Sequence, residues 1–283
     1  MIKNIAYFPF QCALNSKSVM GAALDCLQAS GIQTQENSMN SDAAIIWSVL
    51  WHGRMKPNQE VYRHYRSQNK PVIVIEVGSL YRGDTWKIAV NHVNATGYYG
   101  HLDNLDWDRP RKLNISLATQ LVTRPEIVIA TQHQHSLLVQ PISPVEQWVR
   151  DQIQLIRNNS DRPIVVRPHP RSPLNIPNLP PGITLQRPNR VTGTYDSYDM
   201  HYNCHAVVNY NSGPGIQAAV AGVRPVVDTS SLAYPVAVGY ADLEQPYQVD
   251  RDLWLTQLCH TEYTTQEIRQ GLWLNRIAPA LNL

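Results

Sequence analysis

The chain has 283 residues, of which 43% are hydrophobic and 16% charged, and its formal net charge is +2. This length suits about two domains or one large domain, and the small net charge excludes a protein that binds nucleic acid through overall polybasic charge. No apolar run reaches the roughly eighteen residues needed to cross a membrane, and the opening sequence MIKNIAYFPF does not resemble a signal peptide. We therefore expect a cytoplasmic protein without a membrane span, and no feature predicts an obligate protein partner.

The first half alternates apolar strands and helices. Strands are predicted at 5–10, 32–35, 43–47 and 71–77, and helices at 19–30 and about 58–68. This order is typical of a parallel sheet with both faces covered. Residues 78–112 are rich in Gly, Asn, Asp, Tyr and Trp and predict a long ordered loop region.

The second half continues the alternation. Strands are predicted at 126–131, 164–167, 183–186, 206–209 and 225–227. A helix is expected to start with Ser143 as N-cap, Pro144 in the first position and Glu146 in a capping box. Two terminal helices are expected to open at Asp250 and Thr264. The fold class is therefore α/β, with two Rossmann-like domains at 1–114 and 115–246 and C-terminal helices at 247–283 that pack back on the first domain.

A glycine-rich turn follows the strand at 206–209. Its sequence is NSGPG, it leads into a small-residue helix, and it contains Ser212, Gly213 and Gly215. Glycines allow backbone N–H groups to approach a ligand, and a helix N-terminus favours phosphate. A tight turn that binds nothing is the alternative. Gln217, in the first part of the helix, is placed to contact a sugar diol.

A second set of polar residues follows the strand at 164–167. Arg167, His169 and Arg171 are released where the strand ends, and ligands of open α/β sheets bind beyond the carboxyl ends of strands. Two arginines near a glycine-rich helix start predict a diphosphate-binding site. Asp228 and Ser230 follow the last strand predicted in this half, at 225–227.

Glu76 is the candidate catalytic residue of the first half. It ends an apolar strand, so it lies at the carboxyl edge of the predicted sheet, where a general base is useful. The alternative is a carboxylate that caps a loop amide or pairs with Arg82. Basic and aromatic residues accompany it, a combination that suits a polyanion with stacked bases. The candidate DNA contacts are Arg54, Lys56, Tyr81, Arg82, Trp86 and Lys87.

Metal binding is not expected. His201 and His205 are four residues apart, a spacing that suits metal on a helix, but no third ligand accompanies them. The four cysteines, Cys12, Cys26, Cys204 and Cys259, show no CxxC spacing and predict free thiols. His133 and His135 alternate on an extended segment and predict a surface strand.

These motifs together resemble the GT-B glycosyltransferases, in which two Rossmann-like domains face each other across a cleft. The C-terminal half, with RPHPR at 167–171 and NSGPGIQAAVAGVRPVV at 211–227, is similar to bacterial capsule-polysaccharide transferases. The N-terminal half is similar to the phage DNA β-glucosyltransferase that modifies 5-hydroxymethylcytosine. There the resemblance rests on a loop ending in Lys-Pro-Asn at 56–58 and an apolar strand ending in Glu76. The chain is shorter than that family and has Gln217 where a glutamate is expected.

The resemblance implies an inverting transfer of sugar from a nucleotide sugar, UDP-glucose in the first instance, to 5-hydroxymethylpyrimidine bases flipped out of double-stranded DNA. The resemblance also implies residue roles. Glu76 would deprotonate the acceptor, and Arg167 and Arg171 would neutralise the diphosphate. Asp228 and Ser230 would border the donor pocket. One alternative keeps the fold but has a capsule or surface glycan as acceptor. Another, of a different class, is a non-catalytic module that binds a nucleotide or nucleic acid.

Overall fold

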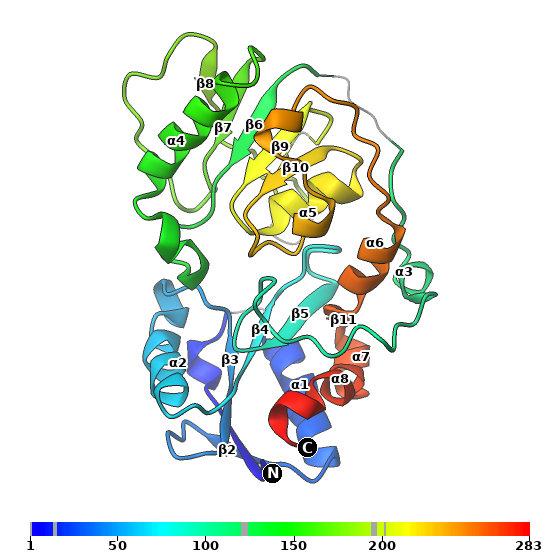
Figure 1. Ribbon diagram of the computed structural model, residues 1–283. Helices are drawn as coiled ribbons and strands as arrows, with labels where there is room; N and C mark the ends of the chain where they lie inside the picture. Colours follow the sequence, from blue (N-terminus) through cyan, green and yellow to red (C-terminus); the bar gives the residue numbers. More distant parts are fainter. Residues whose placement is uncertain (1, 14–15, 120–123, 194–196, 201) are drawn as a thin grey trace. The chain divides into compact units, whose positions relative to one another are not determined.

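The computed structural model describes residues 2–13, 16–119, 124–193, 197–200 and 202–283 (Figure 1). The chain forms two compact units. The first contains Met1–Trp107 and Gln257–Leu283, and the second contains Asp108–Thr256. The C-terminal segment therefore belongs to the same unit as the N-terminus. Each unit is an α/β layered structure and is described separately below.

Within the described residues, the first unit is built on a six-stranded sheet in the order β11-β5-β4-β3-β1-β2. The strands β1 to β4 are parallel, whereas β5 runs antiparallel to β4 and β11 runs antiparallel to β5. The strands are β1 Asn4–Tyr7, β2 Gln33–Glu36, β3 Ala43–Trp47, β4 Val72–Val77, β5 Thr85–Val90 and β11 Glu262–Thr264.

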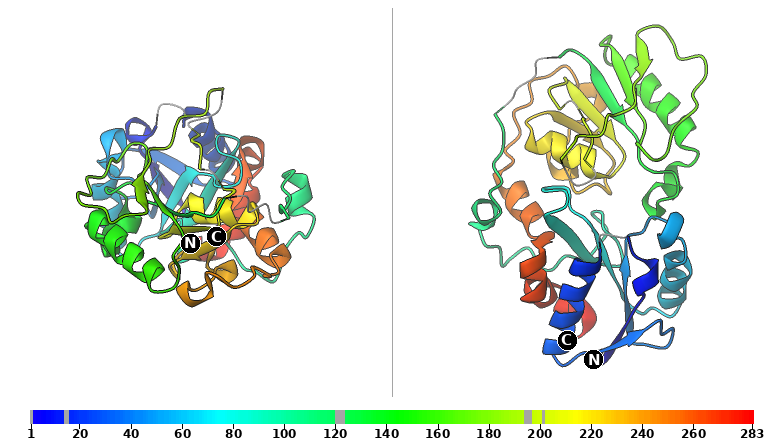
Figure 2. Two further views of the ribbon diagram at one scale, coloured as in Figure 1. Left: turned by 90° about the horizontal axis from the view of Figure 1, so that it is seen from above. Right: turned by 180° about the vertical axis from the view of Figure 1, so that it is seen from behind.

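Helices cover both faces of this sheet. The helix α2 packs on β3 and β4, whereas α1 packs against α7, as the view from behind in Figure 2 also shows. Buried apolar residues such as Trp273 and Ile277 anchor the C-terminal helices in the core. The helices are α1 Lys17–Ala29, α2 Asn58–Ser67, α7 Thr265–Arg269 and α8 Leu272–Leu281, with 3-10 turns η1 Pro9–Gln11 and η2 Gly53–Met55.

The described part of the second unit has a five-stranded sheet in the order β10-β9-β6-β7-β8, with all pairs parallel. Because the chain moves outward from β6 to β8 and then returns to β9, the strand order reverses between β6 and β9. Ligands of open α/β sheets bind beyond the carboxyl ends of strands at such a reversal. The strands are β6 Ile127–Ala130, β7 Ile164–Arg167, β8 Ile183–Leu185, β9 Ala206–Asn209 and β10 Arg224–Val227.

Two apolar clusters fill the faces of this second sheet. One lies under α4 and includes Val149, Ile156 and Val166, and the other includes Ala218 of α5. The helices are α3 Arg109–Lys112, α4 Val145–Arg157, α5 Gly213–Val220 and α6 Asp252–Cys259, with 3-10 turns η3 Leu137–Ile142, η4 Tyr234–Val236 and η5 Tyr240–Asp242. The helix α6 crosses from the second unit into the first, because the first unit resumes at Gln257.

The long loop predicted at 78–112 is wrong at 85–90, which form β5, and at 109–112, which form α3. Every residue of β5 is buried, and a turn in which Thr85 N donates to the carbonyl oxygen of Tyr81 (2.9 Å) reverses the chain after β4. An antiparallel pair needs only a short turn. The alternation of parallel strands and crossover helices therefore gave no sign of this strand.

Helix starts were predicted with mixed success. The capping box at Thr264 is confirmed, since Glu267 N donates to Thr264 Oγ1 (3.2 Å) and Thr264 N donates to a Glu267 carboxylate oxygen (2.9 Å). The capping box at Ser143 is wrong, because α4 begins at Val145 with Pro144 as its N-cap, and this helix start has no side-chain capping bond. The last helix is also divided in two at Gly271, whose φ of 83° interrupts the α-helical backbone.

Candidate functional site

The reversal point of the second sheet holds a buried asparagine. Asn209, the last residue of β9, is 1% exposed. Its Nδ2 donates to the carbonyl oxygen of Ala130 at the end of β6 (2.8 Å), and its Oδ1 accepts from Ser212 N (2.8 Å). One side chain therefore fixes the distance between two strand ends and the first turn of α5.

A second amide network extends this arrangement. Asn211, which is 5% exposed, donates from Nδ2 to Ser230 Oγ (2.9 Å), and its backbone N donates to Gln132 Oε1 (2.9 Å). Ser230 in turn donates from Oγ to Asp228 Oδ1 (2.6 Å). Polar side chains from the ends of β6, β9 and β10 are thus bonded to one another, a rigid arrangement that suits the recognition of a polar ligand.

The helix α5 starts at this network. Its N-cap, Ser212, makes no side-chain capping bond. Pro214 has no N–H, so the N–H groups of Gly213 and Gly215 are the donors of the first turn that an anion could use. Gly215 is required by packing, because a Cβ atom there would lie 2.7 Å from Cγ1 of Val227. The helix start therefore combines available amide donors with a close approach to β10.

Three histidines gather at the ends of β6 and β7. The ring of His133 lies 5.2 Å from that of His169 and 5.5 Å from that of His135, measured between centroids. His133 is 6% exposed, so the prediction that it lies on a surface strand is wrong. Thr131 holds the backbone of His169 in place, because Thr131 Oγ1 accepts from His169 N (3.0 Å).

Arg167 is placed differently from the sequence prediction. Its side chain is 1% exposed, pairs with Asp199 Oδ1 (2.8 Å) and donates to Gln186 Oε1 (3.0 Å). The guanidinium therefore holds the segment around Asp199 and exposes almost no surface to a diphosphate. Arg171, by contrast, is exposed. Gln217 accepts a hydrogen bond from the Tyr202 hydroxyl (2.5 Å), so its amide is already partly occupied.

In the first unit, Glu76 lies near the end of β4 and is half-buried. Its Oε2 accepts from Ser48 Oγ (2.6 Å), and its Oε1 accepts from Val77 N (2.9 Å). Ser48 follows β3 directly and has a φ of 63°, a left-handed conformation that non-glycine residues rarely adopt. Such backbone outliers concentrate at functional sites, and here the outlier directs a hydroxyl at the candidate base.

Two buried charges lie beside Glu76 in the sheet. Lys87 is its register partner on β5, and Glu262 on β11 is the register partner of Lys87 on the other side. Burial lowers the pKa of Lys87, whereas the charges of Glu262 and Glu76 raise it. The carboxylate of Glu262 accepts from Ser79 N (2.6 Å) and Thr85 Oγ1 (2.7 Å), so it also anchors the turn that follows β4.

The predicted DNA contacts separate into two groups. Trp86 and Lys87 are 3% and 5% exposed, and Trp86 packs on Trp47 with ring centroids 5.5 Å apart. Both lie in β5 rather than in a loop, so the prediction that they contact DNA is wrong. Arg54 and Lys56 are exposed at η2, Tyr81 is exposed in the turn after β4, and Arg82 is half-buried beside it.

The structure shows no metal centre within the described residues, where no group of three or more His, Cys, Asp or Glu side chains is suitably arranged. His201 lies outside the described residues. His205 is buried and bonded through Nε2 to the carbonyl oxygen of Leu243 (2.7 Å). In the same described segments, no helix has the length and hydropathy of a membrane span.

Several residues of these sites were not identified from the sequence. Ser48, Asn209, Asn211 and Glu262 are common polar residues, and their importance depends on contacts with distant segments. One signal was present, because Asn209 and Asn211 flank the end of a predicted strand beside the glycine-rich turn. No local pattern marked Glu262, which contacts a turn more than 170 residues away in the sequence, Oε1 accepting from Ser79 N across a separation of 183.

Comparisons with known proteins identify similar folds. No family model matches the sequence, and no curated protein matches it. Two solved structures from Thermosulfurimonas dismutans are similar over nearly the whole chain. The KpsC beta Kdo 2,4 transferase has a TM-score of 0.52 and 10% identity, covering 96% of this chain and 98% of that chain. The KpsC beta Kdo 2,7 transferase has a TM-score of 0.50 and 11% identity, covering 96% and 99%. At such identity, these comparisons establish a similar fold.

Proposed function

We propose that the chain is a glycosyltransferase of the GT-B type that moves a sugar from a nucleotide-sugar donor to a hydroxyl group of a surface polysaccharide. The observation that carries the proposal is the similarity of fold, over 96% of the chain, to two Kdo transferases. Fold alone does not define activity. The second support is therefore the chemistry of the residues at the carboxyl edges of the two sheets.

The second unit would bind the donor. The diphosphate of the donor would contact the N–H groups of Gly213 and Gly215 in the first turn of α5, which has no side-chain cap. His169 and the exposed Arg171 follow β7 at the same edge of the sheet and would supply positive charge or hydrogen bonds. The polar network at the start of α5 would hold the sugar or the nucleoside of the donor. Its members there are Ser212, Asp228 and Ser230.

The first unit would act on the acceptor. The carboxylate of Glu76, oriented by the Ser48 hydroxyl (2.6 Å), would accept the proton of the acceptor hydroxyl. The acceptor oxygen then forms a bond to the anomeric carbon, and the bond from that carbon to the phosphate oxygen breaks. The nucleotide leaves with the electron pair, and its charge is balanced by the donor site.

A glycan acceptor is supported better than hydroxymethylated DNA. The DNA hypothesis relied on a basic and aromatic loop, of which Trp86 and Lys87 are buried in β5. The two similar structures described above are transferases of Kdo. No comparison supports a DNA acceptor. UDP-glucose has no specific support either and is one candidate donor among several.

The test is an assay of the complete chain with a panel of nucleotide sugars, UDP-glucose included, and with both acidic glycans and hydroxymethylated DNA as acceptors. Products are identified by mass spectrometry. We expect sugar to be added to a glycan, and we expect Glu76→Gln to reduce the rate by at least a hundredfold. The matched control is Glu60→Gln, an exposed position on α2, which should leave the rate unchanged.

Three results would count against the proposal. Transfer of sugar to DNA alone would show that the proposed glycan acceptor is wrong. An affinity for DNA that falls steeply with rising salt concentration would support that result. Binding of a nucleotide sugar without transfer to any acceptor would favour a non-catalytic binding module. Full activity of Glu76→Gln would remove Glu76 as the base.

A further inference from the structure

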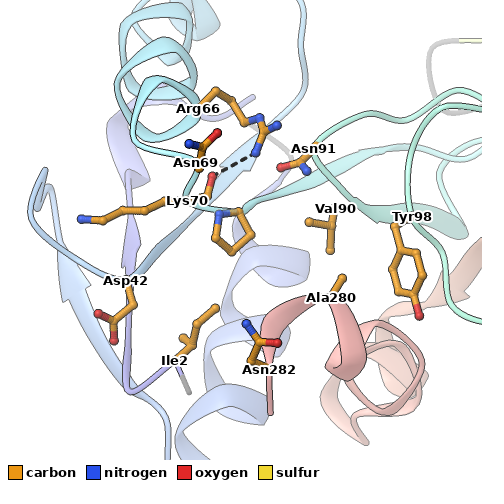
Figure 3. A pocket seen from close by; sticks show the side chains of 11 residues that line it. Ile2, Asp42, Arg66, Asn69, Lys70, Val90, Asn91, Tyr98, Ala280 and Asn282 are labelled. Atoms are coloured by element: carbon orange, nitrogen blue, oxygen red, sulfur yellow. Dashed lines mark hydrogen bonds between the residues drawn. The ribbon is translucent and has the colours of Figure 1, made fainter.

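The first unit contains an open cavity at the edge of the sheet opposite Glu76. Its volume is about 510 Å³, a size that is typical of small-molecule sites. Figure 3 shows that its lining comes from the end of α2, the turn before β4, the end of β5 and both terminal segments of the chain. The cavity therefore lies at the amino-terminal end of β4, whereas Glu76 lies near the carboxyl-terminal end of that strand.

Two cations line this cavity without a carboxylate partner. Within the described residues, neither Arg66 nor Lys70 forms an ion pair within 4.0 Å. Arg66 Nη1 donates to the carbonyl oxygen of Lys70 (3.3 Å), and the guanidinium also interacts with the Tyr62 side chain. Because a guanidinium has five N–H donors, donors remain for a ligand. The ammonium of Lys70 lies 5.8 Å from the centre of the Tyr65 ring.

The single carboxylate of the lining does not cancel these charges. Asp42 Oδ2 accepts from Lys3 N (2.8 Å) and Asn4 N (3.1 Å). These backbone bonds, together with the charge of Lys70, lower the pKa of Asp42. Asp42 is therefore ionised, but the two cations Arg66 and Lys70 outnumber this one carboxylate, so the lining keeps a net positive charge and favours an anion.

Amide and apolar groups complete the lining. Asn91 uses Oδ1 to accept from Val72 N (3.1 Å), which leaves its Nδ2 as a donor, and Asn69 and Asn282 are exposed at the cavity. Pro71 and Ala280 contribute apolar surface. Amides bind hydroxyl groups as both donors and acceptors, and apolar surface packs on C–H groups.

We propose that this cavity binds a small acidic sugar. Its carboxylate or phosphate group contacts Arg66 and Lys70, its hydroxyl groups contact the asparagine amides, and its ring packs against the apolar part. A guanidinium recognises both carboxylate and phosphate groups through paired N–H donors. The experiment therefore tests one sugar with a carboxylate and one with a phosphate. This site is separate from Glu76 and does not depend on the proposed transfer reaction.

The experiment measures binding to the complete chain by calorimetry, with three probes of similar size. Glucuronate carries a carboxylate, glucose 6-phosphate carries a phosphate, and glucose is neutral. Each probe is titrated into the wild type, Arg66→Gln, Lys70→Met and the matched control Arg63→Ala. Arg63 lies on the same helix but is exposed and does not line the cavity.

We expect at least one acidic probe to bind and glucose to bind at least tenfold more weakly. Arg66→Gln should weaken binding of the acidic probe at least tenfold, because a hydrogen bond to a charged group is lost. Lys70→Met should weaken binding of the same probe severalfold, and Arg63→Ala should leave its affinity unchanged. The acid that binds more tightly identifies the anionic group. Failure of both acids to bind at millimolar concentration, or binding that neither Arg66→Gln nor Lys70→Met reduces, would overturn the proposal.

Discussion

Lys87 and Glu262 are register partners on the neighbouring antiparallel strands β5 and β11, and both side chains are buried. On the other side of Lys87, Glu76 is its partner on β4. The Lys87 residue therefore lies between two carboxylate residues of adjacent strands, and its Nζ donates to Ser79 Oγ (3.2 Å). Since β11 belongs to the C-terminal segment, the return of the chain to the first unit completes the surroundings of Glu76.

The first prediction concerns this buried pair. Glu262→Ala leaves the Lys87 ammonium without its strongest counter-charge and removes the acceptor of Ser79 N and Thr85 Oγ1. We expect the free energy of unfolding to fall by about 3–5 kcal/mol. Lys87→Met should cost less, because the Glu262 carboxylate keeps its hydrogen-bond donors. Urea denaturation of both single variants and the double variant measures the coupling. If the two single variants lose equal amounts of unfolding free energy and the double variant loses their sum, Lys87 and Glu262 do not interact as a buried pair.

The second prediction distinguishes a structural role of Arg167 from a ligand-binding role. Asp199→Ala leaves a guanidinium that is 1% exposed without its ion pair, and we expect a loss of about 3 kcal/mol or more in unfolding free energy. Arg167→Met should cost less, because the Asp199 side chain is 25% exposed and can be solvated. The measurement is chemical denaturation of both variants. A stable Arg167→Met protein with at least tenfold weaker nucleotide binding would instead restore the original prediction.

These residues also illustrate what the sequence can and cannot predict. The strands at 206–209 and 164–167 have apolar runs followed by polar or glycine-rich turns, so their type, order and polar ends were predicted correctly. The strand β5 was missed because its polar residues, Thr85 and Lys87, are unusual in a fully buried strand. Their burial depends on Glu262, and no local pattern reports a partner so distant in the sequence.

The same limit applies to side-chain roles. Arg167 was correctly placed at a strand end, but the sequence does not reveal that Asp199 and Gln186 bind its guanidinium. Ser48 gave no signal at all, because its left-handed φ results from the turn that the surrounding structure imposes. Position along a strand was therefore predictable, whereas the direction and partners of a polar side chain depended on tertiary contacts.

The third prediction concerns pH and His205. Burial lowers the pKa of this histidine, the charges of Arg224 and Arg162 lower it further, and the Leu243 carbonyl and Glu244 oppose the shift. The unfolded chain, with a usual histidine pKa of about 6.5, therefore binds more protons just below that value. The free energy of unfolding should fall as the pH decreases through about 6.5.

The measurement for His205 compares urea midpoints at about pH 7.5 and about pH 5.5. His205→Gln can still donate to the Leu243 carbonyl but does not titrate, so its midpoint should depend less on pH than that of the wild type. Some dependence should remain, because burial and Arg66 also lower the pKa of His92. An identical pH dependence in wild type and variant would show that His205 does not contribute.

The fourth prediction concerns the close approach of α5 to β10. In Gly215→Ala the new Cβ would lie 2.7 Å from Cγ1 of the partly buried Val227, so the helix start must move. We expect a loss of about 1–3 kcal/mol in unfolding free energy and weaker nucleotide binding, because the amide donors of the helix are displaced. Val227→Ala in the same chain removes the contacting atom and should restore much of the loss.

The matched control for Gly215 is Gly21→Ala. Gly21 lies inside α1 with no atom within 4 Å of the added Cβ, and alanine favours the helix, so this variant should be more stable by about 0.5–1 kcal/mol. Urea denaturation and nucleotide titration of both variants make the comparison. If Gly215→Ala has the stability and the nucleotide affinity of the wild type, α5 does not need the close contact with β10, and its N-terminus loses its support as the diphosphate site.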